Sequence, residues 1–354
     1  MASEVNIGTI FGIKVSLHWT LVLLILLTLL ISLYVFMLMV LLFACVLLHE
    51  LAHSITSQRN KIKVKRIVLS PIAGASIIDM LSVSPEKEFR ISIVGPIMSL
   101  FLSGVFGMLA AISPPGLVVQ TFQILFLMNI LLGVFNLLPT FPMDGGRIFR
   151  SYFQRKHNFF DSTMMVVKAS KYTMALIVVG TIAFIAFWPS YSLPYKEFVA
   201  MLNFIAVMFL YSGTKAEEES AIIKRDTRGL HVGSFVTRKF TFVRSAAALG
   251  EIFKAIKASG EHVVITKIGS NYYYVDVFRK TKVASAKYAR DLAMPIPKVS
   301  ASIGVADALS AMESGDIGIA AVTSGGKLVG ITTSALLQAA ISLHMARELR
   351  KRGA

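Results

Sequence analysis

Two histidines and a glutamate end a long apolar run in the stretch LLFACVLLHELAHSITSQ, residues 41–58. Residues four apart share one face of a helix, so His49 and His53 can bind the same metal ion. Glu50 lies beside them, where a carboxylate can take a proton from an attacking water molecule. Ionisable groups in an apolar segment are costly without a partner, and metal coordination supplies one. The spacing therefore predicts a zinc centre that activates water.

A catalytic zinc ion takes three protein ligands and keeps one position open. The best candidate for the third ligand is Asp144, in the segment FNLLPTFPMDGGRIF. The prolines and glycines around it break a helix, which lets the aspartate point inward. An aspartate before two glycines is also a common turn residue, so that interpretation stays open. Cys45, one turn before His49, is predicted to be a core residue and not a ligand.

The segments that must position these residues have the composition of membrane spans. The chain has 354 residues, of which 55% are hydrophobic and 16% charged, whereas about 25% are charged in soluble domains. Since about 20 apolar residues cross a bilayer, we expect about six transmembrane helices. Two lie in 15–52, and the others are 91–112, 118–138, 166–188 and 198–211.

Basic residues indicate which side of the membrane each loop faces. They gather after the second and the fourth expected span, and cytoplasmic loops carry an excess of Lys and Arg. The amino terminus and everything after Tyr211 are therefore expected in the cytoplasm, with the protein in the cell membrane. Such loops also explain the net charge of +16, so the expected partner is membrane lipid and not nucleic acid.

A β-hairpin is predicted between the second and third spans, where KIKVKRIVLSPIAGASIIDM partly alternates apolar and basic residues. An extended peptide could add to the edge of this hairpin, over residues 61–76. After Thr214 the composition changes to a charged connector, 214–230, and then to a soluble α/β domain, 231–354. EHVVITKIGSNYYYVDVF and DIGIAAVTSGGKLVGITT each suggest two strands after a helix, which indicates an internal repeat.

Taken together, these motifs resemble the site-2 protease family of intramembrane zinc metalloproteases, in its prokaryotic form with a carboxy-terminal CBS pair. HELAH matches the family's zinc helix, and NLLPTFPMDGGR matches its N-x-x-P-x-x-P-x-D-G-G-R segment. EFRISIVGPIMSL is similar to its third-span entry, with Gly95 and Pro96. SPIAGASI is similar to its Gly-Gly hairpin, with Ala73 in place of one glycine. The resemblance covers residues 5–213.

The resemblance implies a multi-pass α-helical membrane domain, 1–213, with a β-hairpin near its active site. One Zn²⁺ per chain would be held by His49, His53 and Asp144, with Glu50 as the general base. Asn136 would help to hold the substrate carbonyl or its oxyanion, although a helix-end capping amide is the alternative interpretation. The implied substrate is a transmembrane protein segment, cleaved in regulated intramembrane proteolysis.

The repeat in 231–354 resembles a pair of CBS domains, a module that in many proteins binds adenine nucleotides or forms dimers. The nucleotide-binding version ends G-x-x-T-x-x-D. Here Gly330 and Thr333 are present, but Leu336 stands at the aspartate position, and Lys280 falls there in the first copy. A purely structural dimerisation module is therefore the alternative. CBS pairs also regulate membrane channels and transporters, an alternative function that metal analysis of the purified protein would distinguish.

We expect weak binding of ATP or AMP to the segment 230–354, because neither copy supplies the ribose-binding aspartate and unpaired buried hydroxyls lose affinity. Calorimetric titration of this segment measures the affinity. Sub-micromolar binding would show that the alignment at Lys280 and Leu336 is wrong.

Overall fold

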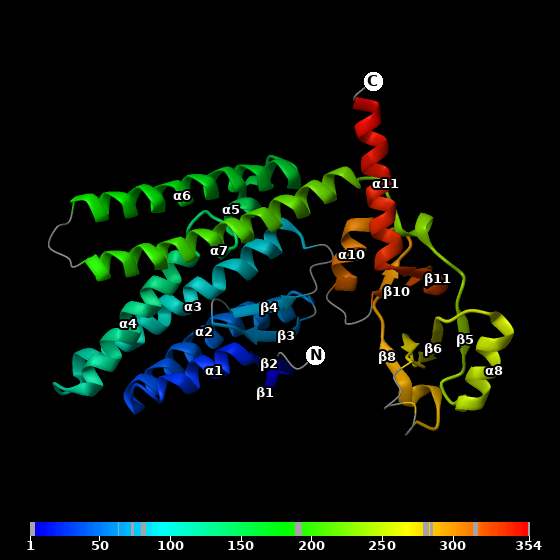
Figure 1. Cartoon of the computed structure of the whole chain (residues 1–354), viewed down its shortest axis with the longest axis horizontal. Helices are drawn as coiled ribbons and strands as arrows, with labels where there is room; N and C mark the ends of the chain where they lie inside the picture. Colours follow the sequence, from blue (N-terminus) through cyan, green and yellow to red (C-terminus); the bar gives the residue numbers. More distant parts are fainter. Residues whose placement is uncertain are drawn as a thin grey trace. The chain divides into compact units, whose positions relative to one another are not determined.

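The computed structural model describes residues 4–62, 64–71, 74–78, 83–187, 193–278, 283, 286–313 and 318–352. Ala73, Trp188 and Lys280, on which sequence expectations rest, lie outside the described residues. The chain divides into two compact units, with the boundary after Ile222 (Figure 1). The first unit contains every residue that the sequence proposes for the metal site.

Helices dominate the first unit, and five of those described are long and apolar enough to cross a membrane. They are α2 (Leu33–Arg59), α3 (Pro85–Ile112), α4 (Leu117–Asn136), α6 (Phe159–Phe187) and α7 (Leu193–Asp226). Helices α2, α3 and α4 pack against one another (Figure 1). A short helix, α5 (Asp144–Phe153), packs between α3 and α6. The predicted multi-pass helical architecture is confirmed.

The first expected span is shorter than predicted. It forms α1 (Trp19–Thr28), whose 10 residues extend only about 15 Å, half of the roughly 30 Å hydrocarbon core. The chain then turns, and α2 begins after Ser32, whose hydroxyl accepts a hydrogen bond from the Val35 amide at 3.1 Å. The described residues therefore contain five candidate spans in place of six, because part of the apolar run is used in a strand and a turn.

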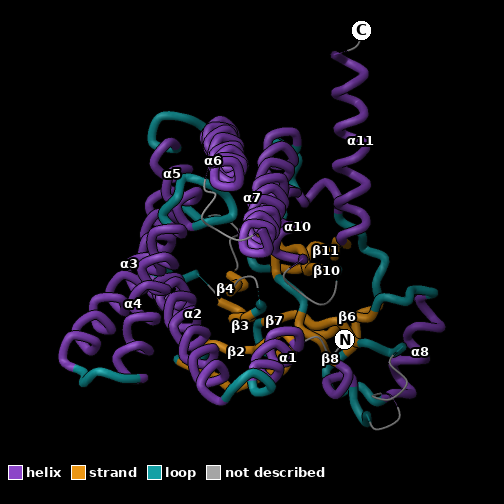
Figure 2. The backbone as a smooth tube through the Cα atoms, turned by 60° about the vertical axis from the view of Figure 1, so that its left-hand side comes forward, coloured by secondary structure: helices purple, strands orange, loops and turns teal. Residues whose placement is uncertain are grey.

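A four-stranded sheet packs against these helices, in the order β1-β2-β3-β4 (Figure 2). Its strands are β1 (Glu4–Ile10), β2 (Ile13–His18), β3 (Val64–Leu69) and β4 (Gly74–Ile78). The predicted hairpin is β3–β4, which is antiparallel; the amino-terminal hairpin β1–β2 was not expected. Parallel pairing of β2 with β3 joins the start of α1 to the end of α2. The two hairpins therefore lie on the same side of the bundle, although α1 is short.

Small polar residues lie buried between the helices of the bundle, and many large apolar side chains are exposed on its outside. Serine hydroxyls bond to carbonyls of their own helices, as Ser57 does to His53 at 2.9 Å and Ser170 to Val166 at 2.9 Å. Small residues let helices approach closely where lipid surrounds the bundle. The buried set includes Ser54, Ser57, Ser92, Ser99, Ser103, Asn129, Ser162, Thr163 and Ser170.

Helix α7 is longer than the span expected at 198–211. It continues without interruption through the charged residues after Thr214 and ends at Asp226. The segment expected to be a connector is thus largely helical, and the boundary between the two units falls inside α7.

The second unit contains the expected repeat. The first copy is β5 (Thr241–Val243), α8 (Leu249–Ser259), β6 (Val264–Ile268), β7 (Asn271–Val275) and β8 (Ala293–Pro295). The second is β9 (Lys298–Ser300), α10 (Val305–Glu313), β10 (Ile319–Ser324), β11 (Lys327–Thr333) and α11 (Ser334–Arg352). In each copy the first strand pairs in parallel with the second, which forms an antiparallel hairpin with the third. Glycines at positive φ, Gly269 and Gly325, make the hairpin turns.

Candidate metal centre

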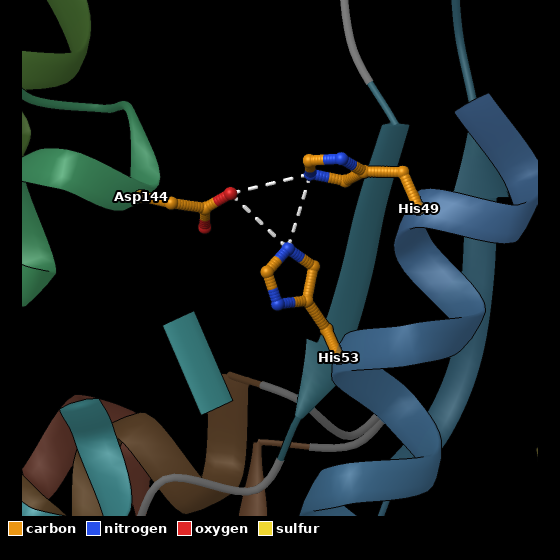
Figure 3. Close-up of side chains that lie close together, drawn as sticks. All are labelled: His49, His53 and Asp144. Atoms are coloured by element: carbon orange, nitrogen blue, oxygen red, sulfur yellow. Dashed lines mark hydrogen bonds and ion pairs between the residues drawn. The ribbon is translucent and has the colours of Figure 1, made fainter. Parts of the chain in front are cut away.

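Three side chains from two distant parts of the chain meet inside the first unit (Figure 3). His49 Nε2 and His53 Nε2 lie 3.1 Å apart. Asp144 Oδ2 is 3.2 Å from His49 Nε2 and 3.1 Å from His53 Nε2. Both histidines are buried, with exposed fractions of 3% and 6%. The two long sequence motifs therefore meet at one point.

The geometry of this group suits zinc. Bonds of about 2.0–2.1 Å to nitrogen and oxygen in a tetrahedral site place neighbouring ligand atoms about 3.3 Å apart. The three observed separations of 3.1–3.2 Å are close to that edge length. Two imidazoles and one carboxylate are also a known donor set for a catalytic zinc ion. The residues present fit the metal.

Helix α3 orients both imidazoles through their second nitrogens. His53 Nδ1 donates to the carbonyl oxygen of Ile91 at 2.7 Å, and His49 Nδ1 lies 2.9 Å from Ser99 Oγ. Because a carbonyl can only accept, the Nδ1 of His53 carries a proton, and Nε2 is the nitrogen that faces the group. Such outer contacts fix the ring orientation that metal binding requires.

Gly95 gives the imidazoles their space. A Cβ atom at this position would lie 2.6 Å from His49 Nε2 and closer still to the His53 ring. No side chain can therefore replace its hydrogen without displacing the ligands. Ile91, Gly95 and Ser99 are four residues apart, so a single face of α3 forms the back wall of the centre.

Asp144 is the first residue of α5, and a tightly packed loop places it there. The Phe141 amide donates to Ser170 Oγ at 3.0 Å, and the Phe141 carbonyl accepts from Thr214 Oγ1 at 3.1 Å. A Cβ at Gly146 would lie 2.8 Å from the Thr140 carbonyl oxygen. Ser170 of α6 and Thr214 of α7 thus hold the loop. The space next to the Thr140 carbonyl leaves no room for a side chain at position 146, so glycine is needed there. The fold therefore places the Asp144 carboxylate beside the two imidazoles.

A cavity of about 760 Å³ opens onto the three ligand atoms. Glu50 lines it next to His49 and His53, within reach of a substrate in the cavity. Ser70 and Pro71 at the β3–β4 turn form another part of its wall. The predicted site residues and the predicted hairpin therefore border the same space.

Asn136 and Cys45 differ in their relation to this cavity. Asn136 lines it at the end of α4, and its amide nitrogen donates to the Leu132 carbonyl at 2.8 Å. A capping amide is expected to make such a bond to its own helix. Asn136 still lies at the wall of the cavity. Cys45 is buried, as predicted for a core position.

Sequence reasoning did not identify the contacts that hold the ligands. The Ile91 carbonyl has no signal in the sequence because every residue carries one. Ser99 could have been found from its spacing of four from Gly95. Ser170 and Thr214 are single hydroxyls in separate helices, and only the tertiary structure brings them to Phe141.

Comparisons with known proteins show which family model and which metalloproteases this chain resembles. Residues 37–115 and 113–180 match the model of peptidase family M50. The zinc metalloprotease MJ0392 of Methanocaldococcus jannaschii is 30% identical over 244 residues, which are 64% of this chain and 63% of the relative. This chain therefore spans less than two thirds of the length of that relative.

Two solved structures resemble separate parts of the chain. The site-2 protease from Methanocaldococcus jannaschii matches with a TM-score of 0.45 and 28% identity, over 61% of this chain and 95% of that one. The CBS domain of a bacterial CNNM/CorC family Mg²⁺ transporter, solved in complex with ATP, matches with a TM-score of 0.28 and 14% identity. That match covers 36% of this chain and 97% of that one.

Replacement of Gly95 by alanine should weaken zinc binding by about 10- to 100-fold, the range typical when the surroundings of metal ligands change, because the new methyl group displaces both imidazoles. Chelator competition on the purified protein measures the affinity. Gly104→Ala on the same helix, where a Cβ meets nothing within 4 Å, is the matched control. Equal affinities in the two variants would contradict the back-wall role of Gly95.

Proposed function

We propose that the protein is an intramembrane zinc-dependent endopeptidase, on the premise that residues 37–115 and 113–180 match the model of peptidase family M50. It hydrolyses peptide bonds in transmembrane or membrane-proximal protein segments. The observation that carries the proposal is the group of three ligand atoms, 3.1–3.2 Å apart, inside a bundle of helices apolar enough to span a membrane. A channel or transporter, the alternative from the sequence, needs no such group beside a glutamate.

Under this proposal His49, His53 and Asp144 hold one zinc ion per chain. Bound there, zinc supplies a Lewis acid that lowers the pKa of water and polarises a peptide carbonyl. The chain's own contribution is to orient the two imidazoles, through Ile91 and Ser99, and to leave the cavity side open.

Glu50 is the proposed general base. Its carboxylate accepts the proton of the attacking water and passes it to the nitrogen of the departing amine, so the C–N bond breaks without forming an amide anion. Asn136, on the wall of the same cavity, is the proposed donor to the substrate carbonyl oxygen. Its amide group has a second N–H besides the one given to Leu132.

The depth of the site determines what form of substrate it takes. His49 lies ten residues before Arg59 in the continuous helix α2, or about 15 Å from the end of that helix. A substrate helix hides its amides from attack, so the segment must unwind before cleavage. Strand β4 is the outer strand of its sheet, and the β3–β4 turn reaches the cavity. We assign the free edge of β4 as the place where the extended substrate pairs.

The position of the protein in the cell follows the charge distribution. Basic residues follow α2 and lie in and after α5, so we assign the end of α2 and the region of α5 to the cytoplasmic side. The second unit is assigned to the same side. The paired repeat of the second unit is proposed to regulate cleavage, with dimer formation and nucleotide binding as its candidate inputs. Membrane lipid is the remaining partner, in contact with the exposed apolar faces.

Glu50→Gln should retain zinc and fold while cleavage falls by about 10²- to 10⁴-fold, the usual contribution of general acid–base catalysis. The amide cannot accept the proton, whereas the three ligands are unchanged. Incubation with a panel of membrane-spanning segments, alongside metal analysis, measures both properties. Cleavage at the wild-type rate would remove Glu50 from the proposed mechanism.

Asp144→Ala should weaken zinc affinity by more than about 100-fold, beyond the 10- to 100-fold typical of outer contacts, because it removes a ligand atom. Cleavage should be lost with the metal. Equilibrium dialysis against zinc provides the measurement, and Asp161→Ala, an exposed acidic residue bonded to Asn158, is the control. A variant that binds zinc as tightly as wild type would mean that the third ligand lies elsewhere.

A further inference from the structure

A buried ion cluster outside the metal group joins three helices of the first unit. Arg150 of α5 is 6% exposed and bonds to two carboxylates, Glu88 of α3 and Glu217 of α7. Its Nε lies 3.1 Å from Glu88 Oε1, and its Nη1 lies 2.6 Å from Glu217 Oε2. Burial lowers the pKa of Arg150, but Glu217 and Glu88 raise it above the ordinary value, so the guanidinium stays charged.

This cluster holds the helix that presents Asp144. Helix α5 has only 10 residues, too few to be stable without tertiary contacts. Glu217 also lies 3.7 Å from Arg147, one turn before Arg150 on the same helix. One carboxylate of α7 therefore contacts two successive turns of α5, and Asp144 is the first residue of that helix.

Helix α7 contacts the loop before Asp144 as well. A Cβ at Gly213 would lie 2.6 Å from the Pro142 ring, and Thr214 donates to the Phe141 carbonyl. Residues 213–217, little more than one turn of α7, thus contact the segment that carries Asp144 on both sides of the aspartate. The two histidines are held separately, by α3.

The same helix ends inside the core of the second unit. Ile223 packs against the buried cluster of the second repeat, which includes Val299 and Leu337. Lys224 Nζ forms an ion pair with Asp307 Oδ1 at 3.1 Å. From Glu217 to Ile223 the helix is unbroken, a distance of about 9 Å. Glu217 and the turn that packs in the second unit therefore lie on one continuous helix.

We infer that Glu217 is a positioning residue of the metal centre, because through Arg150 and Arg147 it fixes α5 and with it Asp144. A change in the second unit that shifts the last turn of α7 would then alter the position of Asp144. The inference rests on the proposed zinc site and names its route of regulation. The position of α5 is sensitive to the loss of Glu217, because the Arg150 guanidinium would then stay buried with only one of its two carboxylates.

The first test compares Glu217→Gln with Glu219→Gln in the full-length protein. Glu219 is two residues further along the same helix, with its side chain 61% exposed and a carboxylate 3.8 Å from Lys215. We expect Glu217→Gln to weaken zinc binding about 10- to 100-fold and to change the visible spectrum of bound cobalt(II), which reports ligand geometry. Glu219→Gln should leave both unchanged.

Glu217→Asp keeps the charge but shortens the side chain, and its zinc affinity should fall between those of wild type and Glu217→Gln. It also decides the question if the glutamine variant does not fold. Wild-type zinc affinity and a wild-type cobalt spectrum, in Glu217→Gln or failing that in Glu217→Asp, would overturn the positioning role.

The second test addresses the route into the second unit with a double-mutant cycle. Ile223→Ala loosens the last turn of α7 and should alter zinc affinity several-fold in wild type, but little in the Glu217→Gln background. Val264→Ala, on β6 in the separate core of the first repeat, is the control and should leave zinc affinity unchanged. Equal effects of Ile223→Ala in both backgrounds would overturn the route.

These measurements separate the inference from the proposed function. If wild type binds zinc but cleaves no membrane segment, the protease proposal fails while zinc affinity still tests Glu217. If wild type binds and cleaves, and Glu217→Gln matches it in both, the inference fails alone.

Discussion

The approach of two imidazoles and a carboxylate to within 3.2 Å of one another governs the architecture of the first unit. Three groups that each prefer water must be brought together inside a bundle of apolar helices, and every contact around them serves that end. Ile91 and Ser99 set the rings, Gly95 leaves room for them, and Phe141 is held on both its amide and carbonyl.

The same constraint bears on the small polar residues that lie buried between the helices, beside apolar residues such as Leu125 and Val166. Serines and glycines allow α2, α3 and α4 to approach closely, and some of the hydroxyls, such as that of Ser57, bond to carbonyls of their own helix. A conventional core of large apolar side chains would fill the space that the ligands, the cavity and water need. The exposed leucines and phenylalanines supply the lipid contact instead.

The sequence predicted the parts of the site that depend on local spacing. His49 and His53 follow from the helical repeat, and the β3–β4 hairpin follows from alternation. Asp144 required the motif resemblance, because only the fold brings residues 53 and 144 together. The Glu88–Arg150–Glu217 cluster escaped because its members stand far apart and look like ordinary loop charges. The short α1 was missed because hydropathy measures apolar length and not where a strand begins.

Parallel pairing of β2 with β3 constrains the order in which the chain can fold as well as the final structure. Lys14 can find its partner Arg66 only after α1 and α2 have been synthesised and have turned back. Helix α1 is too short to hold a place in the bilayer alone, so it must enter as a hairpin with α2. The sheet then closes only around a correctly inserted pair. All four of its strands precede Asp144 in the chain, so they are translated before the aspartate that completes the metal group.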